Sequence, residues 1–114
     1  MTTLYGIRNC DTVRKARRWL DDNGIEYTFH DVRSEGLDRK MLQAWEKQLG
    51  WEQLLNRRGT TWRRLPDDVR EGIDRTRAIQ VMLENPAIIK RPVLAVGGQL
   101  YQGFNASTYS EIFD

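Results

Sequence analysis

The sequence contains a single cysteine, Cys10, among 114 residues. This excludes a framework of internal disulfides, a zinc site built from several thiolates and a CxxC redox pair. Three roles remain for the thiol: a buried inert side chain, an exposed side chain without a role, or a nucleophile. Which of these roles Cys10 has is therefore the first question that the sequence raises.

Long apolar runs are also missing. No stretch approaches the roughly 18 consecutive apolar residues of a membrane span. A secretory signal has a basic segment followed by an apolar one. The first residues, MTTLYGIRNC, do not show this pattern. We therefore expect a soluble, cytoplasmic protein that does not bind membranes.

A strong charge of one sign is absent as well. The 18 Lys and Arg residues nearly balance 16 Asp and Glu residues, and the net charge is +2. Such a balance gives no bulk attraction for nucleic acid. Arginine supplies 14 of the 18 cations, which favours local, bidentate binding of oxyanions or carboxylates.

The first third of the chain predicts a strand, a helix and a second strand. Residues 2–6 form a short β-prone run, and apolar residues then recur at helical spacing from Asp11 until Asn23-Gly24 stops the helix. Residues 25–32 alternate between apolar and polar side chains, as in a half-buried strand. A strand, a helix and a strand of these lengths predict a right-handed βαβ unit with parallel strands.

The middle of the chain predicts helices only. They are expected at residues 37–49, where Asp38 opens the helix, and at 51–55, 67–73 and 76–83. In residues 56–65 the apolar side chains recur with neither helical nor strand spacing, so no regular element is expected there.

The end of the chain predicts a hairpin and a last helix. Strands are expected at 93–96 and 99–101, joined by a primed turn at Gly97-Gly98. Asn105 or Ser107 is expected to cap a helix that runs to Phe113. The whole order predicts an α/β fold: a thioredoxin-like four-stranded mixed sheet with a helical insertion between the βαβ and ββα halves. We expect one domain, residues 1–114, with the insertion at about 37–85.

Cys10 lies between the first strand and the first helix. Free backbone N–H groups and the positive end of the helix dipole favour a thiolate there. Arg8 adds positive charge, Thr12 offers a hydroxyl and an N–H, and Asp11 opposes the anion unless its side chain caps the helix. This position favours a reactive thiol over an inert one. Because Val13 stands where a CxxC pair would have its second cysteine, an outside thiol must complete any disulfide intermediate.

Three segments resemble a known family: LYGIRNCDTVRKARRWL, LGWEQLLNRRGTTWRRL and IIKRPVLAV. They resemble the arsenate-reductase-like family, which includes the ArsC enzymes, the Spx regulators and above all the small YffB proteins, whose likeness covers essentially the whole chain. The resemblance implies a thioredoxin-like fold with a helical insertion, a nucleophilic Cys10 and a cis proline at Pro92. It also implies a reductase activity linked to glutathione or glutaredoxin.

The resemblance also suggests residues that hold the substrate. ArsC enzymes hold the oxyanion with a set of arginines, and Arg91 matches the one before the proline of the third core strand. In the insertion, Asn56, Arg57 and Arg58 compete for the second position, and the Spx pattern favours Arg58. The planar fork of Arg91 suits an oxyanion or the carboxylate of a thiol tripeptide. Pro92, if cis, would expose the backbone of Arg91 to an extended ligand.

Two residues of the ArsC pattern have no counterpart. The third arginine is absent, since its place reads Gln102-Gly103-Phe104, and Gly6 does not supply the histidine that precedes the ArsC cysteine. These departures count against arsenate as the physiological substrate.

Other residues are assigned structural roles. His30, the single histidine, lies on the polar phase of the second strand and is expected to be solvated or capped. Four arginines near Trp62 imitate a nucleic-acid patch, but acidic Asp67-Asp68 follow directly, so we expect no nucleic-acid binding.

The sequence thus predicts a glutathione-dependent thiol reductase with Cys10 as the catalytic nucleophile. We expect the substrate or glutathione to be bound by Arg8, Asn9, Asp11, Thr12, Arg58, Arg91 and Pro92. No metal and no bound cofactor are expected. The expected partners of this monomer are glutathione as co-substrate and an oxidised small molecule or protein thiol, with glutaredoxin as a further candidate. Three alternatives stay open: an Spx-like regulator that binds RNA polymerase, an arsenate reductase in the strict sense, and an inactive member of the fold.

Overall fold

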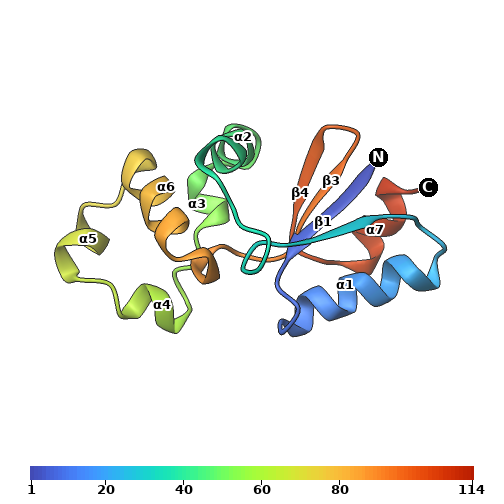
Figure 1. Ribbon diagram of the computed structural model, residues 1–114, viewed down its shortest axis with the longest axis horizontal. Coiled ribbons are helices and arrows are strands. Elements are labelled where there is room, and N and C mark those ends of the chain that lie inside the picture. Colours follow the sequence, from blue (N-terminus) through green and yellow to red (C-terminus); the bar gives the residue numbers. More distant parts are fainter. The chain divides into compact units, whose positions relative to one another are not determined.

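The computed structural model describes residues 1–114, which divide into two compact units (Figure 1). The first, which we call the sheet unit, comprises Met1–Glu35 and Arg91–Asp114. The second, the helical unit, comprises Gly36–Lys90. The predicted insertion at about 37–85 lies within the helical unit, and the single domain stays a prediction. No helix in either unit is long and apolar enough to cross a membrane.

The sheet unit contains a four-stranded mixed sheet in the order β2-β1-β3-β4. Its strands are β1 (Thr2–Gly6), β2 (Thr28–Asp31), β3 (Val93–Val96) and β4 (Gln99–Gln102). β1 pairs with β2 in parallel, while β1 with β3 and β3 with β4 are antiparallel. The register places Gly6 opposite Asp31 and Tyr5 opposite Val93. The end of β1 therefore lies beside the end of β2 and the start of β3.

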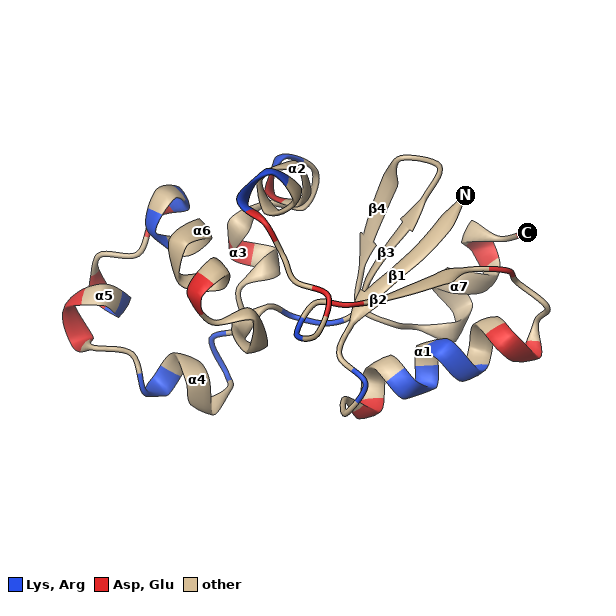
Figure 2. Ribbon diagram, in the orientation of Figure 1, with Lys and Arg blue, Asp and Glu red and all other residues tan.

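Two helices, α1 (Asp11–Asp22) and α7 (Ala106–Ile112), pack against this sheet. The core between them consists of side chains that are at most 1% exposed: Leu4, Val13, Ala16, Leu20, Leu94 and Tyr109. The other positions of α1 carry most of the charge of this helix (Figure 2). This division follows from the apolar spacing of the sequence, which turns one helix face to the sheet.

The turn and the cap near the end of the chain agree with the sequence. Gly97 and Gly98 have φ angles of 56° and 89°, as the primed turn of a two-residue hairpin requires. Asn105, rather than Ser107, caps α7, because its side chain accepts a hydrogen bond of 3.2 Å from the N–H of Thr108.

The helical unit contains α2 (Arg39–Leu49), α3 (Trp51–Leu54), α4 (Thr60–Arg63), α5 (Asp67–Glu71), α6 (Arg75–Glu84) and the 3-10 turn η1 (Pro86–Ile88). Asp38 opens α2 as predicted and accepts a 2.8 Å hydrogen bond from the N–H of Met41. An ion pair of 2.6 Å joins Arg75 of α6 to Glu46 of α2, which is 9% exposed.

The elements β2 and α4 differ clearly from the sequence prediction. β2 spans Thr28–Asp31 rather than 25–32, because the N–H of Ile25 donates to the carbonyl of Leu20 at the end of α1. The segment 56–65, predicted to be aperiodic, contains the single turn of α4. A helix of one turn is too short to produce a detectable period.

Candidate functional site

Cys10 is the N-cap residue of α1, in the loop that leaves β1. Its backbone is extended, with φ −113° and ψ 125°. The first amides of a helix lack partners within the helix, and a side-chain oxygen of the N-cap residue usually accepts a hydrogen bond from one of them. The neutral thiol makes no such bond, but the N–H groups of Thr12 and Val13 are placed to favour its thiolate.

The surroundings hold the pKa of the Cys10 thiol below its ordinary value. Burial of this half-buried side chain acts in the opposite direction and raises the pKa. It is outweighed by the N–H of Val13, by the hydrogen bond and the positive charge of Arg91, and by the N–H of Thr12. Cys10 therefore forms a nucleophilic thiolate at a lower pH than a free cysteine does.

Strand pairing brings Arg91 to Cys10. Because Val93 at the start of β3 lies opposite Tyr5 near the end of β1, the residues just before β3 lie beside the chain that has just left β1. The peptide bond between Arg91 and Pro92 is cis, as the family resemblance implies. Pro92 is below 2% exposed, and its carbonyl accepts a 2.8 Å hydrogen bond from Gly103. Arg91 is therefore fixed at one end by a buried neighbour.

The side chain of Arg8 contacts Asp31 and Ser34 rather than Cys10. Its guanidinium donates to Asp31 at 3.3 Å and to the hydroxyl of Ser34 at 3.4 Å, and it is not among the groups that lower the pKa of the Cys10 thiol. Asp11 pairs with Arg14 and forms no cap. The sequence expectation that Arg8 supplies positive charge to the thiolate is therefore not supported.

The other predicted site residues are divided between the two units. Asn9 is exposed in the turn before α1, and Thr12 contributes its N–H while its side chain is exposed. Arg58 belongs to the helical unit, where its N–H donates to Asn56 at 3.0 Å and its carbonyl accepts from Arg63 at 2.9 Å. A role of Arg58 beside Cys10 stays a prediction.

Arg57, the rival of Arg58, is engaged with two tryptophans. Its guanidinium carbon lies 5.2 Å from the ring centre of Trp51 and 5.7 Å from that of Trp62. Such cation–π stacking stabilises the local chain. It leaves Arg58 as the better candidate of the two for an anion.

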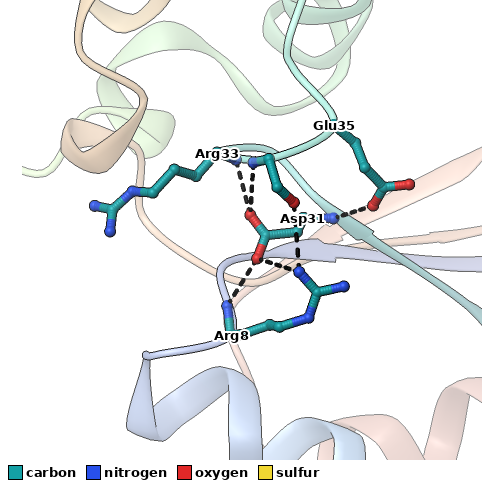
Figure 3. A network of polar contacts seen from close by, with 5 residues as sticks. Arg8, Asp31, Arg33 and Glu35 are labelled. Atoms are coloured by element: carbon teal, nitrogen blue, oxygen red, sulfur yellow. Dashed lines mark hydrogen bonds and ion pairs between the residues drawn. The ribbon is translucent and has the colours of Figure 1, made fainter.

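Asp31 is a residue that the sequence argument missed. Its side chain accepts hydrogen bonds from two N–H groups of the following turn, Arg33 at 2.9 Å and Ser34 at 3.2 Å, and from the backbone and the guanidinium of Arg8 at 3.1 and 3.3 Å (Figure 3). Burial raises the pKa of this carboxyl, but the N–H groups of Ser34, Arg33 and Arg8 and the charge of Arg8 hold it below its usual value. The available signal was a charged residue on the apolar phase of β2, after Ile25, Tyr27 and Phe29.

Two surface hollows of the sheet unit lie at different distances along the chain from Cys10. A cavity of about 600 Å³ is lined by Met1, Thr2, Asp21 and residues 25–28, at the opposite end of β1 from Cys10. A smaller one of about 260 Å³ lies on α1 and is lined by Asp11, Arg14, Lys15 and Arg18. No group of three or more His, Cys, Asp or Glu side chains is placed to hold a metal ion.

A mixed sheet of this order, with a cysteine at the N-terminus of the first helix and a cis proline before the third strand, defines the thioredoxin-like class. The chain belongs to the ArsC family, whose model matches residues 5–112. The fold class and the family resemblance predicted from the sequence are both confirmed.

Relatives with similar sequences include two proteins of different description. An uncharacterised protein of Haemophilus influenzae is 48% identical over 113 residues, which cover 99% of both chains. The global transcriptional regulator Spx of Enterococcus faecalis is 30% identical over 107 residues, which cover 92% of this chain and 80% of that protein.

Solved structures show the same fold. A YffB protein superposes with a TM-score of 0.93 at 44% identity, covering 97% of both chains. An arsenate reductase (ArsC) related protein from Brucella melitensis superposes with a TM-score of 0.81 at 52% identity, covering 99% of this chain and 94% of that one.

Proposed function

We propose that the protein is a thiol reductase in which Cys10 is the single nucleophile and glutathione is the external thiol. The observation that carries this proposal is the set of groups around Cys10, whose N–H donors and guanidinium lower the pKa of the thiol and so favour the thiolate. Membership of the ArsC family, with an arsenate-reductase-related protein among the solved relatives, supports the same chemistry.

The reaction has two exchange steps. The Cys10 thiolate attacks one sulfur of a substrate disulfide, a new S–S bond forms, and the other sulfur leaves as a thiolate that takes a proton from water. A glutathione thiolate then attacks the substrate sulfur of this mixed disulfide and releases Cys10 as the thiolate. A second glutathione reduces the resulting glutathione–substrate disulfide in solution. Two glutathione molecules are thereby oxidised to one disulfide, and the substrate disulfide is reduced to two thiols.

The external thiol follows from the cysteine count. Cys10 is the only cysteine, and Val13 occupies the position that a second cysteine of a CxxC pair would take. Glutathione fits because it carries carboxylates that a guanidinium binds well, and Arg91 is hydrogen-bonded to the sulfur that glutathione must reach. The hollow on α1, lined by Asp11, Arg14, Lys15 and Arg18, offers further net positive charge in the same unit.

Mass spectrometry of the intact protein after incubation with oxidised glutathione tests the proposal. We expect one glutathione adduct, mapped to Cys10 by peptide analysis and removed by reduced glutathione. The Cys10→Ser variant is the control and should take up none. A native protein that forms no adduct, and whose thiol titrates like a free cysteine, would contradict the proposal.

A second candidate function is regulation through a protein partner, as in Spx regulators. The relative in Enterococcus faecalis carries this description at 30% identity, and the partner implied by the family resemblance is RNA polymerase. Purified core polymerase mixed with the protein on a gel-filtration column tests this candidate. Co-elution that the Arg58→Ala variant abolishes would support it, and separate elution would oppose it.

Arsenate is the alternative oxidised substrate, because the solved relative from Brucella melitensis is described as related to an arsenate reductase. Consumption of glutathione can be followed with arsenate or with a low-mass disulfide as the sole oxidant. Turnover with the disulfide alone would favour the thiol reductase, and turnover with arsenate would make the protein an arsenate reductase in the strict sense.

A further inference from the structure

Asp31 connects the end of β2 to the loop that carries Cys10. It is opposite Gly6 in the sheet, and the next residue, Val32, donates a 2.9 Å hydrogen bond to the carbonyl of Gly6. Two residues beyond Gly6, the N–H of Arg8 donates to Oδ2 of Asp31 at 3.1 Å. The backbone that leads from β1 to Cys10 is therefore attached to β2 at both Gly6 and Arg8.

The carboxylate of Asp31 is saturated by these contacts. Oδ2 accepts from the backbone and the guanidinium of Arg8, and Oδ1 accepts from the N–H groups of Arg33 and Ser34 (Figure 3). The N–H of Asp31 itself donates to the carboxylate of Glu35 at 2.8 Å. Asp31 is only 5% exposed, and a buried carboxylate is stable only when its oxygens have such donors.

The guanidinium of Arg8 is held on two sides. It donates to Asp31 and Ser34, and its central carbon lies 5.7 Å from the ring centre of Phe29 on β2. Ser34 follows β2, so all three contacts fix Arg8 against one edge of the sheet. A loop fixed in this way has fewer conformations, and the cysteine two residues later is restricted with it.

We propose that Asp31 is a positioning residue for Cys10: its carboxylate fastens Arg8, and with it the loop between β1 and α1, so that the sulfur stays in reach of the first amides of α1 and of Arg91. This rests on the proposed function, since it requires Cys10 as the nucleophile. It also gives Arg8 an indirect role, through Asp31, in place of direct stabilisation of the thiolate.

Two effects of the substitution Asp31→Asn have opposite signs. Removal of a negative charge near the site favours the thiolate and lowers the pKa of Cys10. Loss of the contacts between Asp31 and Arg8 lets the loop move, so that the sulfur moves away from the α1 amides and Arg91 and the pKa of Cys10 rises. The asparagine keeps the shape but replaces one acceptor oxygen by a donor group, so the contacts to Oδ1 and Oδ2 cannot all persist. The direction of the change therefore distinguishes positioning from simple electrostatics.

The experiment measures the rate of iodoacetamide alkylation of Cys10 against pH in the wild-type protein, in Asp31→Asn and in Asp22→Asn. Asp22 is an exposed acid at the far end of α1 and serves as the matched control. We expect the midpoint for Asp31→Asn to rise by about one pH unit, which lowers the thiolate fraction about tenfold at pH values below both midpoints. Asp22→Asn should leave the midpoint where it is. An unchanged or lowered midpoint in a folded Asp31→Asn protein would overturn the inference.

Variants of Arg8 provide the second test. Arg8→Lys keeps the positive charge and the backbone N–H, so electrostatics predicts no change, whereas positioning predicts a raised midpoint. In the Asp31→Asn background, Arg8→Lys should add no further shift, because Arg8 acts through Asp31. If Asp31→Asn does not fold, Arg8→Lys alone decides, and an unchanged midpoint would overturn the inference.

The wild-type titration separates the two proposals. A wild-type midpoint equal to that of the unfolded chain would contradict the proposed function itself. A low wild-type midpoint that neither Asp31→Asn nor Arg8→Lys raises would contradict only the role of Asp31.

Discussion

The sulfur of Cys10 meets donors from two parts of the chain that are distant in sequence. Thr12 and Val13 belong to its own helix, while Arg91 arrives through the antiparallel pairing of β3 with β1. Any residue at an N-cap position has such backbone N–H donors nearby. The guanidinium of Arg91 reaches the sulfur only because the fold pairs β3 with β1. The arginine is thus the residue that most distinguishes this thiol from an ordinary N-cap cysteine.

Substitution of Arg91 tests this contribution. Arg91→Gln removes the charge, so we expect the pKa of Cys10 to rise by about one unit, in line with the usual effect of an adjacent opposite charge. Arg91→Lys should give a smaller rise, because the charge is kept and the planar fork is lost. Arg64→Gln, at an exposed arginine of the helical unit, is the control. Equal alkylation profiles for Arg91→Gln and the wild type would show that Arg91 does not stabilise the thiolate.

The carboxylate of Asp31 makes the stability of the protein depend on pH. Because its pKa is lowered in the folded state, it stabilises the fold above its unfolded pKa of about 4, and this stabilisation is lost as the pH falls through the folded-state pKa. Urea unfolding should show Asp31→Asn to be less stable than the wild type by roughly 1–3 kcal/mol above about pH 5. The difference should shrink at lower pH. A difference that is constant from neutral to acidic pH would contradict this assignment.

The sequence revealed part of this site. The position of Cys10 before a helix and the proline after Arg91 could be recognised directly, because both depend on neighbouring residues. The link between Arg8 and Asp31 could not, since 23 positions separate the two residues. Closeness in sequence suggested that Arg8 acts on the thiol, whereas its guanidinium contacts Asp31 (Figure 3).

At the scale of elements, the close approach of α1 to β1 sets where Cys10 lies. Gly6 ends β1 directly against the helix: a Cβ atom there would lie 2.7 Å from one methyl carbon of Val13 and 3.0 Å from the other. Both distances are shorter than a normal contact, so no larger residue fits without movement. The absence of a side chain at Gly6 therefore allows the N-terminus of α1 to approach the sheet.

The variant Gly6→Ala tests this packing. We expect it to destabilise the protein by about 1–3 kcal/mol, as overpacking in a core does, and to raise the pKa of Cys10 by displacing the start of α1. The double variant Gly6→Ala with Val13→Ala removes the clashing methyl groups. Its loss of stability, measured by urea unfolding, should be smaller than the sum of the two single losses. Additive losses would indicate that Gly6 and Val13 are not in contact.

The elements that the sequence predicted well have strong local signals. α1, α2 and α7 combine an apolar face with a recognisable start, and Gly97-Gly98 permits one type of turn. β2 was predicted too long because alternation alone does not reveal that the N–H of Ile25 already bonds to the end of α1. α4 has neither a side-chain cap nor enough residues for a period.

Over the whole molecule, positive and negative charges nearly balance, and several arginines form ion pairs with carboxylates of the same chain. Arg8, Arg14, Arg70 and Arg75 each have a carboxylate partner, and Arg57 stacks on two tryptophans. Internal pairing and stacking therefore account for five of the 14 arginines. Of the three arginines predicted for the site, Arg91 lowers the pKa of the Cys10 thiol and Arg8 pairs with Asp31, while the role of Arg58 stays a prediction.

The ionisation of Cys10 is coupled to the stability of the whole fold. Since the pKa of the thiol is lower in the folded than in the unfolded protein, the thiolate stabilises the fold. The stabilisation is complete above the unfolded pKa of about 8.5 and disappears as the pH falls through the folded-state pKa. The stability of the wild type relative to Cys10→Ser should therefore increase with pH over this range. A relative stability that falls with rising pH would mean that the fold favours the neutral thiol.

The most direct test of the account is the pH dependence of Cys10 alkylation in one protein under two conditions, native and fully unfolded in denaturant. The single cysteine makes the signal unambiguous. The account predicts that the native midpoint lies clearly below the unfolded midpoint, because the amides of α1 and Arg91 are brought to the sulfur only by folding. A native midpoint equal to or above the unfolded one would contradict the claim that the fold activates Cys10.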